Sequence, residues 1–241
     1  MSPVFSTFIG VESGSWRRPF TYIALDSGRN LLAVGSGSPL NVLAFAFGQS
    51  SALLALSPPL RPYHFHPAGP ESGLVSVSAY LRQAEPGLAR EPGAQRPAPA
   101  DLPIWLRGCF ALLERLNEFG YTPFPTDDAP RQWLEVQSEA AFHAILGLPP
   151  FQAGTLEGRI QRQLVLADQD LDVPDAMDFF EEITRHRLVR GQNAVDKVLP
   201  QSELNGWMAA QLAWLAANQP EALAPVTGLE EGSIYLPIHP L

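Results

Sequence analysis

The first fifty-seven residues decide the fold, and they contain five apolar segments: Val4–Glu12 (VFSTFIGVE), Phe20–Asp26 (FTYIALD), Asn30–Gly35 (NLLAVG), Pro39–Gly48 (PLNVLAFAFG) and Ser51–Ser57 (SALLALS). The first three are typical of strands, and a Ser-Gly turn of the hairpin kind joins the second to the third. The fourth suits a short helix with proline in its first turn. The fifth is a continuous apolar run, as in a buried parallel strand. We therefore expect three antiparallel strands, a crossover helix and a parallel strand.

The rest of the chain predicts an insertion followed by a mostly helical half. Residues 58–103 hold 10 of the 24 prolines, which is typical of a long loop of low complexity. A helical period of apolar residues then runs from Ile104 to about Gly120. The further expected elements are a strand at Gln132–Val136, helices at Ser138–Leu146, Thr155–Asp168, Asp175–Arg190 and Ser202–Asn218, and an edge strand or extended tail at Gly232–Pro237. We expect one domain over residues 1–241 that carries this proline-rich insertion.

The composition excludes several classes of protein. Hydrophobic residues make up 46% of the chain and charged residues 17%, which is a globular composition and not a disordered one. The single cysteine, Cys109, rules out an intramolecular disulfide and fits a reducing compartment. The net charge of -9 argues against general binding of nucleic acid. No signal peptide or membrane span is evident, so we expect a cytoplasmic protein without membrane association.

Several separate motifs resemble those of the domain of unknown function 429 family, a group of predicted RNase H-like nucleases. They are LEVQSEAAFHAILGLPPFQAGTLEGRIQRQ (Leu134–Gln163), FFEEITRH (Phe179–His186), ELNGWMAAQLAWLA (Glu203–Ala216) and EGSIYLP (Glu231–Pro237). The opening FIGVE and the run ALLALSPPL also fall where that family places its first and fourth strands. The resemblance covers nearly the whole chain outside the insertion. It implies an RNase H-like α/β fold, with a mixed sheet of three antiparallel strands plus parallel strands, flanked by helices.

The resemblance also implies an acidic metal site built from four positions. They follow strand one, follow strand four, lie in the EVQSE segment, and begin the last helix. In this chain they are Glu12, Ser57, Glu135 and Asn205. Glu135 keeps the expected residue and Glu12 keeps the charge with one methylene more, whereas Ser57 and Asn205 have lost it. The site is therefore expected to be a degenerate one.

Losing half of the carboxylates matters for metal chemistry. Two Mg²⁺ or Mn²⁺ ions about 4 Å apart need bridging carboxylates to activate water and to stabilise a leaving oxygen. Mg²⁺ in particular demands anionic oxygen ligands in octahedral geometry. We therefore expect a catalytically impaired protein that acts by binding or as an interaction subunit. The alternative is an active metal-dependent nuclease or phosphoesterase that holds one ion through Glu12 and Glu135, with Asp26 or Glu139 recruited.

Each of these positions also has a plainer interpretation. Glu12 at a strand end is equally consistent with a solvated carboxylate, and Ser57 before two prolines with a simple strand terminus. Asn205 interrupts an almost wholly apolar helix, so it is expected to be buried and to need a partner. It either faces the former acidic site or serves the N-terminus of its helix.

Three further groups remain open as binding elements. Arg159 and Arg162 lie one helical turn apart and are phosphate-binding candidates, although ion pairing is the plainer interpretation of these arginines. His64 and His66 flank a phenylalanine and are more simply loop histidines than metal ligands. The proline-rich insertion is a candidate docking element for a protein partner. Neither a substrate nor a partner is identified by these patterns.

Overall fold

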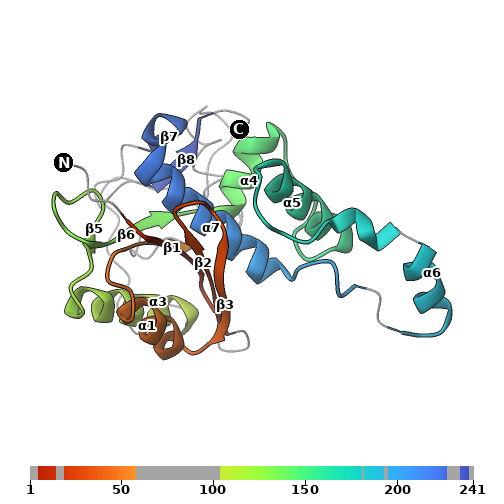
Figure 1. Ribbon diagram of the computed structural model, residues 1–241, viewed down its shortest axis with the longest axis horizontal. Coiled ribbons are helices and arrows are strands. Elements are labelled where there is room, and N and C mark those ends of the chain that lie inside the picture. The colour runs from red at the N-terminus through yellow and green to blue at the C-terminus, as the bar shows by residue number, and fades with distance from the viewer. Residues whose placement is uncertain are drawn as a thin grey trace.

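A computed structural model describes residues 5–14, 19–57, 104–180, 182–192, 195–226 and 234–238. The proline-rich insertion, with His64 and His66, lies outside the described residues. Within them the chain forms a mixed α/β sheet with helices on both faces (Figure 1). The described helices include none that combines the length and apolarity needed to cross a membrane.

The sheet has eight strands among the described residues: β1 (Thr7–Glu12), β2 (Phe20–Asp26), β3 (Leu31–Gly37), β4 (Ala52–Ser57), β5 (Thr122–Pro123), β6 (Arg131–Val136), β7 (Leu223–Val226) and β8 (Ile234–Pro237). Their spatial order is β3-β2-β1-β4-β6-β8-β7, with β5 paired to β6. Strands β1, β2 and β3 form an antiparallel meander, and β1, β4, β6 and β8 are parallel neighbours. The predicted meander, crossover and parallel strand are therefore confirmed, whereas β5 and β7 were not anticipated.

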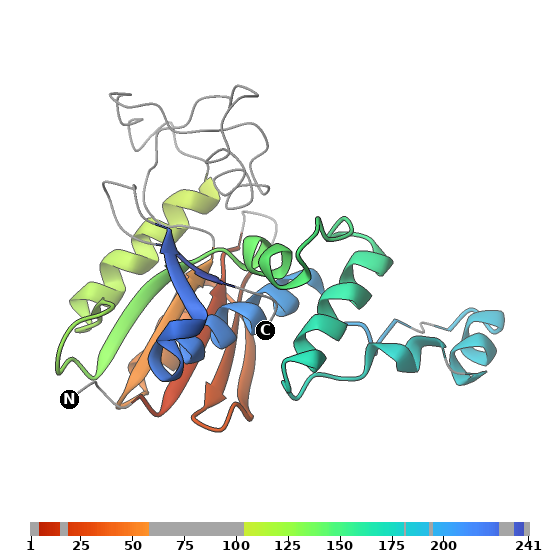
Figure 2. The same cartoon turned by 90° about the horizontal axis from the view of Figure 1, so that it is seen from above.

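The helices are α1 (Pro39–Phe47), α3 (Ile104–Glu118), α4 (Ser138–Leu146), α5 (Leu156–Asp168), α6 (Glu182–Val189) and α7 (Gln201–Asn218), with 3₁₀ turns η2 (Ala176–Phe180) and η3 (Pro220–Ala222). Helix α7 crosses one face of the sheet, and α1 and α3 cover the other (Figure 2). Thr155 caps the N-terminus of α5, because its hydroxyl accepts a hydrogen bond from the Gly158 amide at 3.1 Å.

Two apolar cores lie on opposite faces of the sheet, as the alternation of strand side chains requires. Phe8, Leu53 and Leu134 pack in the core beneath α7. Their neighbours in sequence, Ile9, Leu54 and Trp133, pack in the core beneath α1 and α3. Within each strand, odd-numbered and even-numbered side chains therefore lie on opposite faces of the sheet.

Helix α7 lies directly on strand β1, because two glycines face each other there. A Cβ added to Gly10 would lie 2.1 Å from the Gly206 carbonyl oxygen and 2.2 Å from the Ala210 nitrogen. No side chain separates the helix backbone from the strand at this point. The helix is apolar nearly all round, as expected of one that is enclosed on all sides.

The segment from α5 to α6 extends away from the sheet as an arm (Figures 1 and 2). The prediction of one helix over 175–190 is wrong: η2 and α6 form two separate pieces. At the start of η2 the Asp175 carboxylate accepts a hydrogen bond from the Met177 amide at 2.8 Å. Such a bond is typical of a residue that caps the N-terminus of a helical segment.

Candidate functional site at the ends of strands β1 and β4

Glu12 and Ser57 end neighbouring parallel strands and lie side by side. They are register partners in the β1–β4 pair, and the Ser13 amide donates to the Ser57 carbonyl at 2.7 Å just beyond. Both residues belong to the α7 face, since Phe8 and Leu53 alternate onto it. Ser57 is buried, and Glu12 is half-buried. The first two predicted site positions therefore meet beneath the start of α7.

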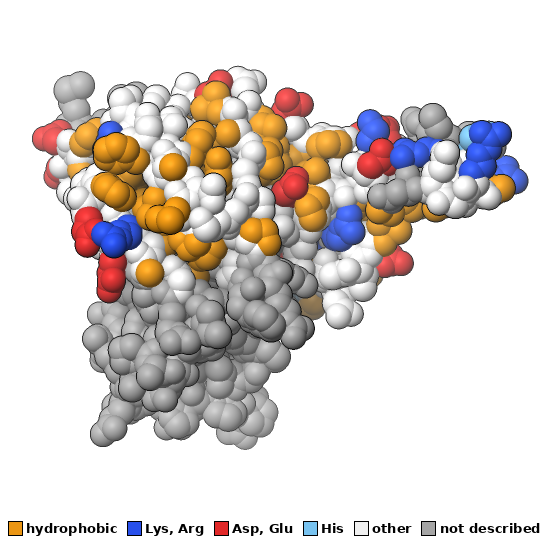
Figure 3. Space-filling model, turned by 90° about the horizontal axis from the view of Figure 1, so that it is seen from below, with side chains coloured by type: hydrophobic (Ala, Val, Ile, Leu, Met, Phe, Trp, Pro, Cys, Tyr) orange, Lys and Arg blue, Asp and Glu red, His pale blue; other side chains and the backbone are white. Residues whose placement is uncertain are grey.

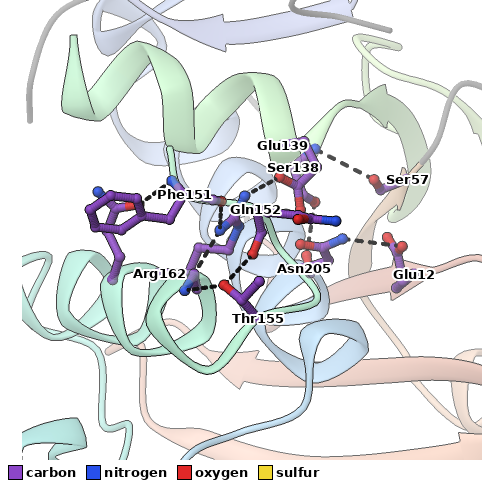
Figure 4. A network of polar contacts seen from close by, with 11 residues as sticks. Glu12, Ser57, Ser138, Glu139, Phe151, Gln152, Thr155, Arg162 and Asn205 are labelled. Carbon is purple, nitrogen blue, oxygen red and sulfur yellow. Dashed lines mark hydrogen bonds and ion pairs between the residues drawn. The ribbon is translucent and has the colours of Figure 1, made fainter. Parts of the chain in front are cut away.

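Asn205 reaches this point from the second turn of α7. Its Nδ2 donates a hydrogen bond to Oε1 of Glu12 at 3.2 Å (Figure 4). The N-cap of α7 is Pro200, and no side chain caps the helix. Of the two alternatives left open for Asn205, the structure therefore favours the former acidic site over service to the helix N-terminus.

Ser138 joins the same cluster from the start of α4. Its hydroxyl donates to the backbone carbonyl of Asn205 at 2.8 Å, and its amide lies 3.4 Å from the Ser57 hydroxyl oxygen (Figure 4). Ser138 is fully buried, so both contacts are shielded from water. The cluster of Glu12, Ser57, Ser138 and Asn205 thus ties α4 and α7 to the ends of β1 and β4.

Glu135 is placed differently. It pairs in register with Leu56, whose side chain belongs to the core beneath α1 and α3. Its own neighbours Leu134 and Val136 pack beneath α7. Strand alternation therefore directs Glu135, which is buried, to the face opposite Glu12. Three of the four predicted positions come together, and the fourth lies across the sheet.

The donor set at this site does not fit the predicted Mg²⁺ or Mn²⁺ ion. No group of three or more His, Cys, Asp or Glu side chains is placed to hold a metal in the part of the chain that the structure describes. The Glu12 oxygen nearest Asn205 accepts an N–H, and Ser57 contributes only a neutral hydroxyl. Divalent magnesium needs several anionic oxygens in fixed geometry, which these residues do not supply.

The two arginines predicted to bind phosphate have structural partners. The Arg162 guanidinium donates to Oε2 of Glu139 at 2.6 Å and to the carbonyl oxygens of Phe151 and Gly158 at 2.9 and 2.8 Å (Figure 4). Arg162 is 1% exposed, so a phosphate has no access to it. Arg159 donates to the carbonyl oxygens of two residues that precede α7. The burial of Arg162 favours a structural role for that residue, whereas phosphate binding by the half-buried Arg159 stays a prediction.

The carboxylates suggested as substitutes are also engaged. Asp26 pairs with Thr7 at the start of β1, so it lies at the opposite end of the strand from Glu12. Hydrogen bonds from Asn30 and Gly28 hold the pKa of the Asp26 carboxyl below its usual value. Glu139 does adjoin Ser138, but its Oε2 is ion-paired with Arg162. Asp26 therefore cannot complete the site, and Glu139 carries its own counter-charge.

Burial perturbs other titratable groups near the cluster. Desolvation raises the pKa of Glu203 in the first turn of α7 and lowers the pKa of His143 in α4. Burial also raises the pKa of the Cys109 thiol to about 12, and the negative charge of Glu12 contributes to that rise. Each shift favours the neutral form of the group, as expected where water is excluded.

The sequence analysis did not identify Ser138 or the burial of Arg162. The second was open to detection, because Gly158, Arg162, Val165 and Leu166 share one buried helical face at spacings of three and four. Ser138 carried no such signal. Comparison of the chain with protein-family models, with curated proteins and with solved structures finds no match.

Proposed function

We propose that this chain is an RNase H-like protein that acts by binding and not by cleavage. Three antiparallel strands, followed by parallel strands added beside β1, support that architecture. The single observation that carries the functional proposal is the hydrogen bond from Asn205 to Glu12. In place of a metal-binding carboxylate, the last helix offers an N–H donor to the remaining acid.

The hydrogen-bonded cluster holds α4 and α7 against the ends of β1 and β4. An amide N–H partly neutralises Glu12, which is the task a cation performs between two carboxylates. The Ser138 hydroxyl holds the backbone of α7 at the same point. The result joins two helices to two strand ends without any ion. Hydrogen bonds that are shielded from water are stronger than exposed ones, so these contacts strengthen the junction.

The arm supplies a surface suited to a protein partner. Met177, Phe180, Leu188 and Val189 are exposed by 50%, 64%, 54% and 82%. Lysine or arginine side chains gather at its end (Figure 3), and helix α6 contains Arg185 and Arg187. Large apolar side chains exposed on a projecting element are available for contact with a partner. These residues favour an interaction subunit over a protein without a partner.

Hydrolysis assays test the loss of cleavage directly. Single- and double-stranded DNA, RNA and RNA–DNA hybrids are incubated with the full chain and Mg²⁺ or Mn²⁺. We expect the same background as with the Glu12→Gln and Glu135→Gln variants. Metal-dependent turnover that either variant abolishes would overturn the proposal.

A gain-of-binding variant tests the conversion of the site. Asn205→Asp restores a carboxylate beside Glu12, and calorimetric titration with Mn²⁺ should then detect binding that the unmodified chain lacks. Gln211→Glu is the matched control, because Gln211 is another buried amide on α7. Equal Mn²⁺ binding by the unmodified chain and by Asn205→Asp contradicts the proposed role of Asn205.

A further inference from the structure

A cavity lies between the C-terminal end of α7, the loop that follows β5 and strand β8. Its volume is about 410 Å³. The described residues that line it are Phe5, Phe124, Pro125, Thr126, Asp127, Gln132, Ala216, Ala217, Pro220, Leu223 and Tyr235. The volume falls within the range of pockets that hold small molecules, about 300–1,000 Å³.

This pocket is separate from the Glu12 cluster. Phe5 precedes β1 and Glu12 ends it, a separation of seven residues. At about 3.3 Å per residue along an extended strand, Phe5 lies roughly 23 Å from Glu12, and Tyr235 of β8 is separated from Ser57 of β4 by strand β6. None of the described lining residues belongs to the Glu12 cluster, so the inference does not rest on the proposed function.

Small residues on α7 leave the space open, and aromatic rings form its walls. Ala216 and Ala217 lie near the C-terminal end of the helix, where a larger side chain would fill the cavity. Across from them, the rings of Phe124 and Tyr235 meet edge to face, with centroids 6.0 Å apart. Edge-to-face packing fixes the orientation of both rings. The walls are therefore preformed.

Hydrogen bonds with Gln132 fix the loop that carries the polar lining residues Thr126 and Asp127. Gln132 is fully buried, and its Oε1 accepts from the Thr126 amide at 2.8 Å. Its Nε2 donates to the carbonyl oxygens of Thr126 and Ala129 at 2.6 and 2.8 Å. One side chain thus holds both ends of the turn that contains Asp127. Gln132 acts as a positioning residue for that carboxylate.

The charge that the described lining residues carry is negative, and it comes from Asp127. Asp127 is exposed at the pocket, and none of the described lining residues is basic. Burial raises the pKa of the Tyr235 hydroxyl, so that group remains a neutral hydrogen-bond donor. Three aromatic rings face the same space, and their negative π-faces attract cations. An anionic ligand finds no counter-charge among these residues.

We propose that this pocket binds a small organic amine, with its apolar part between Phe124, Tyr235 and the alanines of α7, and its ammonium group beside Asp127. The apolar walls account for affinity through the burial of surface. The carboxylate selects the charge of the ligand, and the aromatic rings reinforce that choice.

Three probes of one shape separate these contributions. Phenethylamine, phenethyl alcohol and phenylpropionate are titrated into the full chain, and dissociation constants are measured from NMR chemical shifts. We expect the amine to bind most tightly and the carboxylate least tightly. Because Asp127 is exposed, the amine should lose about three- to fivefold in affinity in Asp127→Asn, while the alcohol is unaffected. High salt should reduce the difference in affinity between the amine and the alcohol.

Matched variants place the binding site. Ala217→Trp fills the cavity and should abolish binding of the amine, whereas Asn218→Trp adds the same ring at the next, exposed position and should not. Asp128→Asn is the control for charge, because Asp128 is the adjacent acid with φ of 60°, a conformation that asparagine tolerates. Circular dichroism verifies folding of each variant. Unchanged amine binding by folded Ala217→Trp, or phenylpropionate binding as tightly as phenethylamine, overturns the proposal.

Discussion

The amide nitrogen of Asn205 lies 3.2 Å from a carboxylate oxygen of Glu12, although 193 positions separate the two residues in the sequence. The contact joins the end of the first strand to the beginning of the last long helix. The orientation is the favourable one, because the opposite orientation of the amide would place two oxygens together. Oδ1 of Asn205 is buried and has no hydrogen-bond partner among the described residues.

Replacing this amide by an acid should destabilise the protein in a pH-dependent way. In Asn205→Asp two carboxylates face each other, which raises the pKa of the pair. The free energy of unfolding should fall by on the order of 3 kcal/mol at pH values above the raised pKa of the folded protein. This loss should disappear below the carboxyl pKa of the unfolded chain, which is about 4. Urea unfolding at about pH 8 and about pH 5 measures it. The same loss at both pH values would show that charge repulsion is not its cause, and Asn205→Ala serves as the uncharged control.

The buried ion pair between Arg162 and Glu139 gives a second prediction. Their side chains are 2% and 16% exposed. Arg162→Met leaves Glu139 without its counter-charge and should lower the free energy of unfolding by about 3–5 kcal/mol. The double variant Arg162→Met with Glu139→Leu should lose less, because no uncompensated charge remains. Urea unfolding of both proteins checks this order, and a larger loss in the double variant contradicts it.

The close contact of α7 with β1 predicts unequal effects of two alanines. Gly10→Ala forces a methyl group into the backbone of α7, with no flexible side chain to yield, and should cost about 3 kcal/mol or more. In Gly206→Ala the nearest atom is the Cγ1 of Ile23, at 2.9 Å. That side chain can shift, so thermal unfolding should show a smaller loss. Equal losses would show that α7 adjusts its position freely.

Cys109 should be chemically inert in the folded protein. It is buried, and its pKa of about 12 keeps the thiol protonated at neutral pH, whereas the thiolate is the reactive form. A disulfide reagent that releases a coloured thiolate should react slowly with the native chain and at once after denaturation. As this is the single cysteine, one absorbance trace reports its exposure. A fast reaction with native protein would contradict the burial.

Asp26 predicts a small acid-sensitive contribution to stability. Its pKa is lowered in the folded protein, chiefly by hydrogen bonds from Asn30. Its contribution is therefore present above the unfolded pKa and is lost as the pH falls through the lower folded value. Solvent screens this exposed carboxylate, so Asp26→Asn should cost less than about 1 kcal/mol near pH 7 and still less near pH 3. Urea unfolding at both values tests the direction.

Local patterns in the sequence predicted most of the fold. The run Ala52–Ser57 is apolar throughout, and it is buried on both faces in the middle of the sheet. Strand β7, by contrast, contains a proline and only four residues, so no pattern distinguished it from a loop. The division of the expected 175–190 helix into η2 and α6 was not predicted, because hydrophobic periodicity does not separate a 3₁₀ turn from an α-helix.

The candidate site was predicted less completely, because its geometry depends on strand register. Glu12 and Ser57 ended strands whose parallel pairing was expected, and they do lie together. The face to which Glu135 points depends on its pairing with Leu56, and a shift of one residue would reverse it. Ser138 contacts two segments distant in sequence, and its contribution is visible only once α4 and α7 are placed.

The close packing of α7 against β1 has a consequence for synthesis on the ribosome. Strand β4 ends at residue 57, and α7 begins 144 residues later, at residue 201. At about 5–20 residues per second, roughly 7–29 s pass between synthesis of the end of β4 and synthesis of the start of α7, the helix that covers these strands. During that time the apolar face around Phe8 and Leu53 lacks its cover. The nascent chain is thus a natural client for chaperones until its last fifth is translated.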